Sequence, residues 1–363
     1  MLLAGELSRR GIDVAVCERR AEAGGGSRAI GVHAPVLGAL EASGVTERLL
    51  EHALRVPRGE ARADGRPLGV VRFDRLSTRF PFVATLPQAA TESVLSDGVP
   101  EPLRGADVLA VVPRGDRVGV RARVGGHLTE WDAPIVVVAS GASGRGLVYR
   151  SPRPHEYRDR YLMADIAVPP RPDDAVAVVN LDRDGVLESF PLPGGRRRFV
   201  AWDDPDADPE GRDDRLRAAL RARGEDAAAN ALAVATGFGV RRFVAPRLRR
   251  DRIFAIGDAA HEVSPIGGQG MNLGLLDAVT LAPLLAEWTR SGSAPEADLA
   301  RWERRRVRSA RTAASLAAVN TALGRPLRGR ADAARRVAVR AMLSGAAGAL
   351  FARAYAMGFD RDA

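Results

Sequence analysis

The chain has 363 residues, of which 46% are hydrophobic, and its length favours about two domains. The formal net charge is +9, but all 54 basic residues are arginines, which are spread over every segment with few aromatic residues between them. We therefore interpret the positive charge as a consequence of composition and not of a nucleic-acid-binding surface. The lack of lysine excludes Schiff-base enzymes, P-loop NTPases and lysine-dependent halogenases.

Cysteine content and hydropathy narrow the class of protein further. Cys17 is the single cysteine, so the sequence supports neither an internal disulfide nor a cysteine-based metal site, and no metal is predicted. Nothing resembles a signal peptide, and no apolar run approaches 18 residues. We therefore expect a cytoplasmic protein that acts on a small molecule and has no transmembrane segment. The sequence leaves open whether the protein forms a homodimer.

The first predicted elements are a helix and a strand. Leu2 and Leu7 have helical spacing, and alternating apolar residues over 12–18 predict a strand that ends at Glu18. In dinucleotide-binding folds an acidic residue at this place binds the adenosine ribose, so Glu18 and its neighbour Arg19 are candidate cofactor-binding residues. A strand and a glycine-rich turn should precede this helix, so we expect roughly 15 further residues before Met1; the alternative is a shortened, weakly binding protein.

A glycine-rich loop that carries Arg28 follows this strand, and Asp64-Gly65 then predicts the turn of a hairpin. Gln88 opens a helix that runs to Leu95. His33 is predicted to be a packing residue. The remaining elements predicted up to residue 138 are helices at 35–42 and 46–51, a meander of strands at 108–112, 118–124 and 128–131, and a buried strand at 135–138 that leads into Ser140-Gly141.

Residues 153–244 are predicted to be mainly strands, with a hairpin of 186–192 and 197–202 and a helix at 213–223. We interpret the arginine run 196–198 as a solvated hairpin tip rather than a phosphate site. The aromatic and sulfur-containing side chains of this region either line a pocket or belong to the core. They are Tyr161, Met163, Phe190 and Trp202.

The most informative stretch begins with the apolar run 253–256, which predicts a strand buried on both faces. Gly257 and Asp258 end that strand, and a glycine-rich loop then leads to a helix that reaches Leu285, with Asn272 as its expected cap. Pro283 should kink this helix or end it early. Backbone N–H groups at such a helix start favour an electron-rich or anionic ligand.

This stretch resembles the second flavin-binding motif of the FAD-dependent aromatic hydroxylases, the para-hydroxybenzoate hydroxylase-like monooxygenases. The resemblance implies that Asp258 binds the ribityl chain of FAD, that Pro265 lies beside the isoalloxazine, and that the following loop lines its pyrimidine end. The cofactor-binding residues implied in this stretch are Gly257, Asp258, Pro265, Gly267, Gly268, Gln269, Gly270, Met271 and Asn272. Of these, Pro265, Gly267 and Gly268 are expected to position the flavin for catalysis.

The resemblance also assigns roles outside the motif. It implies that Arg28 meets the pyrophosphate of FAD, for which a guanidinium is well suited, and that Gln88 contacts the flavin, although a helix-start glutamine is nearly as good an interpretation. The family has an Asp-Gly pair where this chain has Ser140-Gly141, which puts a contact between the motifs in doubt. For His261 we expect a hydrogen bond to the backbone rather than proton transfer.

The activity implied is that NAD(P)H reduces FAD, and that a C4a-hydroperoxyflavin formed with O2 hydroxylates an aromatic, phenolic or polyketide-like molecule. The alternatives are a flavin-dependent reductase or dehydrogenase of the same fold, and a catalytically silent flavoprotein.

The fold class implied is α/β, a Rossmann-like FAD-binding domain with an inserted, mainly antiparallel sheet. The predicted domains are FAD binding at 1–59, 83–150 and 245–290, a substrate-binding sheet at 60–82 and 151–244, and a helical segment at 291–363. In the last segment apolar residues from Leu299 to Leu323 predict one long helix, residues 324–326 break it, and a further helix is expected over 331–357.

Overall fold

The largest unit of the computed structural model, which describes residues 1–22 and 29–357, is a mixed eight-stranded sheet. Neighbouring strands are antiparallel except β4 and β13, which are parallel. In spatial order the strands are β19 (His261–Glu262), β16 (Thr236–Val244), β12 (His155–Ala167), β15 (Arg196–Asp203), β14 (Gly185–Leu192), β13 (Val176–Asp182), β4 (Arg58–Ala63) and β5 (Arg66–Arg72). The hairpin of β4 and β5 turns at Asp64 and Gly65, both with positive φ, as the sequence predicts.

The two faces of this sheet are covered by different parts of the chain. Helices α5 (Arg212–Arg221) and α6 (Asp226–Ala231) pack on one face, where Leu187 belongs to their apolar cluster. The other face, which we call the inner face, packs its apolar side chains with Ile266 and Val339. Because side chains alternate along a strand, residues on either side of Leu187 point to the inner face. Helix α6 was not predicted.

Four small sheets occur elsewhere in the described part of the chain. The meander of β8, β9 and β10 is confirmed, and β11 pairs in parallel with β18. The strands of these sheets are β1 (Cys17–Glu18) with β7 (Leu103–Arg104); β8 (Ala106–Arg114), β9 (Arg117–Val124) and β10 (His127–Ala133); β11 (Val136–Val138), β18 (Ile253–Ala255) and β17 (Arg249–Arg250); and β2 (Gly31–Val32), β6 (Val83–Thr85) and β3 (Leu54–Val56).

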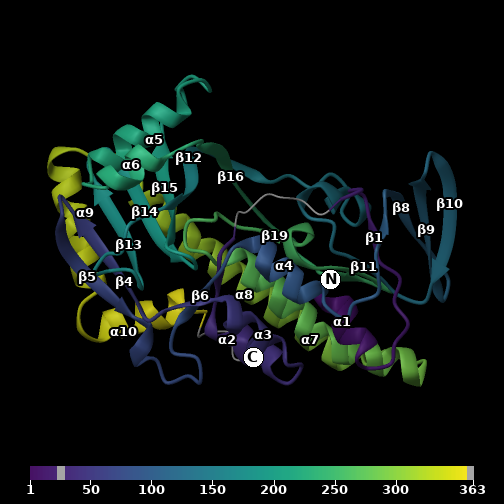
Figure 1. Ribbon diagram of the computed structural model, residues 1–363. Coiled ribbons are helices and arrows are strands. Elements are labelled where there is room, and N and C mark those ends of the chain that lie inside the picture. The colour runs from purple at the N-terminus through teal and green to yellow at the C-terminus, as the bar shows by residue number, and fades with distance from the viewer. Residues whose placement is uncertain (23–28, 358–363) are drawn as a thin grey trace.

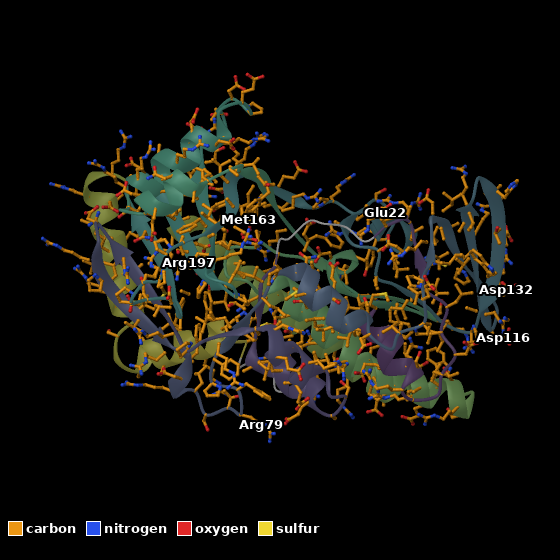
Figure 2. The ribbon with its side chains drawn as sticks, in the orientation of Figure 1. Glu22, Arg79, Asp116, Asp132, Met163 and Arg197 are labelled. Atoms are coloured by element: carbon orange, nitrogen blue, oxygen red, sulfur yellow. The ribbon has the colours of Figure 1, made fainter. Side chains whose placement is uncertain are left out.

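The large sheet and the meander occupy opposite ends of the molecule in Figure 1, and most of the other helices lie between them. Figure 2 likewise places Asp116 and Asp132 at the outer end of the meander, far from Met163 of the large sheet. The helices are α1 (Leu2–Ser8), α2 (Ala34–Glu41), α3 (Val45–His52), α4 (Gln88–Ser96), α7 (Gly270–Ser291), α8 (Glu296–Leu323), α9 (Gly329–Met342) and α10 (Gly345–Tyr355). Of these, α9 and α10 are the exceptions, which lie beside β5 at the large-sheet end. Short 3-10 helices cover Phe73–Arg75, Ala142–Leu147 and Gly257–Ala259.

Three predicted elements differ from the structure. The strand expected over 12–18 is reduced to β1, because among the described residues only Cys17 and Glu18 find a ladder partner, in β7. Helix α7 continues past Pro283 to Ser291, so the proline does not end it early. The helix expected over 331–357 is interrupted after Met342, where α9 and α10 meet at a bend of 87°.

Membrane-spanning potential is limited within residues 1–22 and 29–357. No single helix there combines the length and the apolar content needed to cross a bilayer. Helices α9 and α10, which are bent relative to each other, meet both criteria only when they are taken as a pair.

Candidate cofactor site

The site begins where β18 ends against α7. All three residues of β18 are buried, and Gly257 follows with φ of +60°. A Cβ atom on Gly274 of α7 would lie 3.1 Å from the Cα atom of Gly257, so only glycines allow strand end and helix to approach this closely. The N–H of Gly257 donates to Asp277 Oδ2 at 3.0 Å, which ties the turn to the second turn of α7.

A buried ionic cluster of Asp277, His261 and Arg306 lies under this turn. His261 Nε2 is 2.5 Å from Asp277 Oδ2, and Arg306 Nε donates to Asp277 Oδ1 at 2.8 Å. Burial alone raises the pKa of the Asp277 carboxyl, but the opposing effects of His261 and Arg306 outweigh it and lower the pKa to about 2. The predicted backbone partner of His261 is therefore wrong: a carboxylate from α7 holds its ring.

The glycine loop itself approaches two other segments closely. Gly267 has φ of +117°, and a Cβ atom there would lie 2.9 Å from Asn320 Nδ2 of α8. Gly268 has φ of +68° and faces His33 Nε2. Burial lowers the pKa of His33 to about 4, which keeps this buried imidazole neutral at physiological pH.

Asn272 lies inside the first turn of α7 and is not its cap, because the helix begins at Gly270. Its side chain joins two distant segments instead. Oδ1 accepts the N–H of His33 at 2.8 Å, and Nδ2 donates to the carbonyls of Gly31 and Gly268 at 2.8 and 3.1 Å. Asn272 thus fixes the glycine loop against the start of α2.

Gln269 is buried and binds the C-terminal helix. Its Nε2 donates to the carbonyls of Ala354 and Tyr355 at 3.2 and 3.0 Å, which satisfies two carbonyls at the end of α10. The Gln269 side chain thus packs the loop against α10, while its backbone lies at the start of α7. Met271 is half-buried in the first turn of that helix.

Asp258, Pro265 and Gly268 are exposed although most of their neighbours are buried. The backbone carbonyl of Asp258 accepts two hydrogen bonds from Arg145, at 3.1 and 2.8 Å from Nε and Nη2. Arg145 also forms an ion pair with Glu262 at 2.7 Å. No role for Arg145 was predicted from the sequence, in which it is a lone arginine at the end of the Ser140-Gly141 loop.

Ser140 itself is exposed, and a Cβ atom on Gly144 would collide with its Oγ atom. The contact between the two loops that Ser140 put in doubt is thus made by Arg145 in this chain.

The other predicted cofactor-binding residues that the structure describes lie in or beside β1 and at the start of α4. Burial raises the pKa of the Glu18 carboxyl, but hydrogen bonds and charge from Arg20 lower it below its usual range, so Glu18 stays ionised at neutral pH. Arg20 rather than the exposed Arg19 pairs with Glu18. Gln88 Oε1 accepts the N–H of Ala29 at 3.3 Å. Arg28 lies outside the described residues.

The arginine run on β15 corrects another expectation. Arg197 and Arg198 are buried, 1% and 2% exposed, and only Arg196 is exposed. Arg197 donates to Ser189 Oγ at 2.7 Å, and Arg198 binds Asp165 through two hydrogen bonds of 2.6 and 2.7 Å. The run is a buried polar network, because β15 is a central strand and not a free tip.

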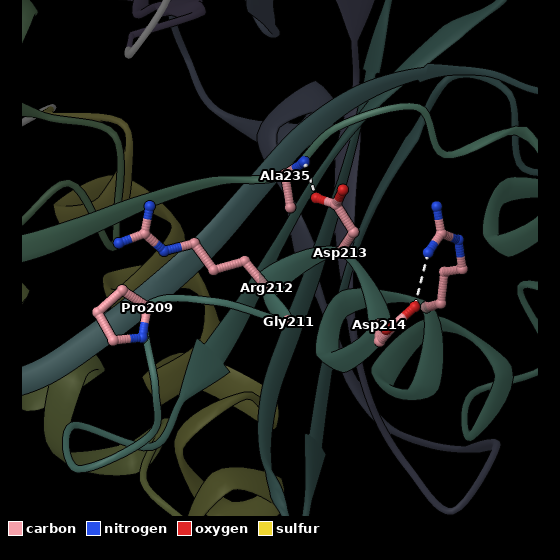
Figure 3. Close-up of a pocket in the computed structure, with 7 residues that line it drawn as sticks. Pro209, Gly211, Arg212, Asp213, Asp214 and Ala235 are labelled. Atoms are coloured by element: carbon pink, nitrogen blue, oxygen red, sulfur yellow. Dashed lines mark hydrogen bonds and ion pairs between the residues drawn. The ribbon is translucent and has the colours of Figure 1, made fainter.

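A pocket of about 370 Å³ at the start of α5 is shown in Figure 3. Its carboxylates already have partners: Asp213 accepts the N–H of Ala235 at 2.7 Å, and Asp214 pairs with Arg217 at 2.8 Å. This pocket lies on the α5 side of the sheet, away from the glycine loop. A second pocket, of about 590 Å³, lies at the edge of the inner face and is lined by Tyr157, Trp202 and Arg325 among others.

A short buried strand, a positive-φ glycine and a long helix that starts after a glycine loop resemble the arrangement by which dinucleotide-binding folds hold a cofactor. The family described as FAD binding domain matches residues 1–317. The chain belongs to this family of flavoprotein monooxygenases related to the aromatic hydroxylases.

Individual relatives agree with this assignment. The chain is 32% identical over 351 residues to 6-methylpretetramide 4-monooxygenase of Streptomyces rimosus, covering 89% of this chain and 61% of that protein. The anhydrotetracycline hydroxylase structure from Streptomyces rimosus superposes with a TM-score of 0.78 at 26% identity, over 98% of this chain and 73% of that one. The fold is shared with p-nitrophenol 4-monooxygenase from Pseudomonas putida DLL-E4, with a TM-score of 0.86 at 20% identity, over 99% of this chain and 94% of that one.

The chain spans about 60% of the length of the curated relatives it matches first. The predicted family, the α/β fold with a large, mainly antiparallel sheet, and the FAD-binding domain are confirmed. The individual site residues and the domain boundaries stay predictions.

Proposed function

We propose that the chain forms the flavin-binding and substrate-binding part of a monooxygenase that uses NAD(P)H and O2 to hydroxylate an aromatic or polyketide-like small molecule. The observation that carries the proposal is the geometry of residues 257–272. Asp258, Pro265 and Gly268 are exposed on a loop whose buried residues hydrogen-bond to the start of α2, to α8 and to α10. A rigid loop with an accessible side is suited to hold a planar cofactor.

The donors and acceptors of this loop fit FAD. The first N–H groups of α7 have no partner within the helix and lie at its positive end, which suits the electron-rich pyrimidine edge of a flavin. The Asp258 carboxylate suits the hydroxyl groups of a ribityl chain, and the ionised Glu18 suits those of a ribose. Bound FAD would supply the redox chemistry and the activation of O2. The residues of this chain position it and exclude water.

Arg145 has a supporting part in this proposal. It clamps the backbone of Asp258 from the preceding loop and is 3% exposed, so the turn that presents the Asp258 carboxylate is held from behind. We infer that Arg145 positions Asp258 without touching the cofactor.

An absorbance spectrum after addition of FAD and desalting tests the proposal. We expect wild type to retain flavin and the Asp258→Ala variant to lose it. The control is Asp251→Asn, which changes an exposed aspartate just before β18 and should leave flavin binding unchanged. Substrate-stimulated oxidation of NADH or NADPH in air then separates a monooxygenase from a reductase, because a reductase also turns over without O2. A wild-type protein that holds no flavin contradicts the proposal.

A further inference from the structure

Glu188 is a buried carboxyl on the inner face of the large sheet. It is 4% exposed, and within residues 1–22 and 29–357 its side chain has no hydrogen-bond or ion-pair partner, although its oxygen atoms are not completely sealed from solvent. A buried polar group without a partner is costly and calls for an explanation, such as a ligand that completes its hydrogen bonds.

Strand pairing sets the surroundings of Glu188. It lies opposite Val179 of β13 and Val200 of β15, and Met163 lies opposite Val200. Paired residues share one face of a sheet, so Glu188 is flanked on both sides by apolar side chains. The carboxyl is therefore the polar group of an apolar row at the centre of the sheet.

The positive charge closest in this pattern is already neutralised. Arg198 lies in the next row, opposite Phe190, and binds the Asp165 carboxylate through two hydrogen bonds. Such bidentate pairing fixes the guanidinium and offsets its charge. A second carboxylate brought to Glu188 by a ligand would thus meet no uncompensated cation in these two rows.

Two tyrosines connect this part of the sheet to the cofactor loop. Tyr161 packs in one cluster with Ile266 of the loop, and the carbonyl of Tyr355 accepts a hydrogen bond from Gln269. Burial raises the pKa of both phenols; the charges of Asp159 and then Glu188 raise that of Tyr161 further, and the charge of Glu188 raises that of Tyr355. The pocket lined by Trp202 opens beside Tyr161, since these two residues are paired across β12 and β15.

We propose that Glu188 is a specificity-determining residue: it hydrogen-bonds an uncharged hydroxyl group on the aromatic substrate and excludes rings that carry a carboxylate at that position. The inference rests on the proposed function, because it places the substrate between the inner face and the flavin loop. Glu188, which has no hydrogen-bond or ion-pair partner in the sheet, would thus select substrates with a hydroxyl group over substrates with a carboxylate.

The test compares three ligands of one shape, namely naphthol, naphthalene and naphthoate, on the FAD-loaded protein. Binding is measured by equilibrium dialysis and by the change that each ligand causes in the flavin spectrum. In wild type at neutral pH, where the Glu188 carboxyl is mostly protonated, we expect naphthol to bind at least about tenfold more tightly than naphthoate. A hydrogen bond to the carboxyl favours the hydroxyl group, and the apolar row around it disfavours burial of a carboxylate. Glu188→Leu should lose the preference for naphthol over naphthalene. At pH about 9, where the wild-type carboxyl is ionised, Glu188→Gln should bind naphthoate better than wild type does.

The matched control is Glu60→Gln, since Glu60 lies on strand β4 of the same sheet but opposite Val178, on the face that Glu188 does not share. Its ligand preferences should equal those of wild type. Unchanged preferences in both Glu188 variants, with flavin retained, overturn the inference and leave the proposed function intact. Loss of flavin from wild type overturns both, and the spectrum distinguishes the two cases.

Discussion

Replacement of Glu188 by glutamine is expected to stabilise the folded protein at neutral pH. Burial raises the pKa of this carboxyl from 4.5 to about 8. At pH 7 it is therefore ionised in the unfolded chain and mostly protonated in the folded one, so folding must take up a proton. One pKa unit corresponds to about 1.4 kcal/mol, so the interval between 4.5 and pH 7 lowers the stability of wild type by about 3 kcal/mol.

The sign of the pH dependence follows from the raised pKa. Below pH 4.5 both states are protonated and the carboxyl costs nothing through ionisation. As pH rises the unfolded chain releases its proton first, and the penalty grows until pH passes about 8, where it levels off. Glutamine has a similar shape and does not ionise, so the variant lacks this slope.

Urea unfolding of both proteins, followed by fluorescence at pH about 5, 7 and 9, measures the difference. Asp165→Asn on the same face is the contrasting variant. It leaves the buried Arg198 without its carboxylate partner and should destabilise by about 3 to 5 kcal/mol. If the advantage of Glu188→Gln is the same at every pH, the carboxyl is not held in apolar surroundings and the reasoning fails.

Three further changes test the cofactor site. Asp277→Asn should lower the free energy of unfolding by about 3 to 5 kcal/mol, because it leaves the buried Arg306 without its carboxylate partner. The pKa of Asp277 is depressed to about 2, so the stability that this carboxylate contributes should be complete above pH 3.8 and be lost as the pH falls through about 2. Gly267→Ala should weaken FAD binding and cost about 1 to 3 kcal/mol in stability, since φ is +117° and Asn320 is close, whereas Gly146→Ala, with open space around it, should behave as wild type in the same denaturation and flavin titrations. Arg145→Leu should raise the dissociation constant for FAD by about tenfold through loss of hydrogen bonds to the Asp258 turn; equal affinity would show that the clamp does not matter.

Elements governed by short-range patterns were predictable from the sequence. The Asp64-Gly65 hairpin, the meander and the long α8 follow from turn residues and from periods of two and 3.6, and the structure has all of them. The glycine loop with Asp258 was also visible, because its residue types are unusual for regular structure.

Errors arose where a neighbour far along the chain decides the outcome. Arg197 and Arg198 look like a solvated tip until β12, β13 and β14 surround them. Pro283 suggests a helix end, but α7 packs on α1, α2 and α8 and continues beyond it. Helix ends and burial depend on tertiary packing, which outweighs local propensity.

The sequence by itself determined the family, the α/β class and the loop expected to hold FAD, because a glycine loop before a helix start depends on consecutive residues. Only the tertiary structure paired Asp277 with Arg306, 29 residues apart, and Gln269 with Tyr355, 86 residues apart. It alone shows that Glu188 is buried without a side-chain partner among residues 1–22 and 29–357. Buried polar groups are satisfied or isolated by whatever the folded chain places around them, and sequence spacing does not encode those surroundings.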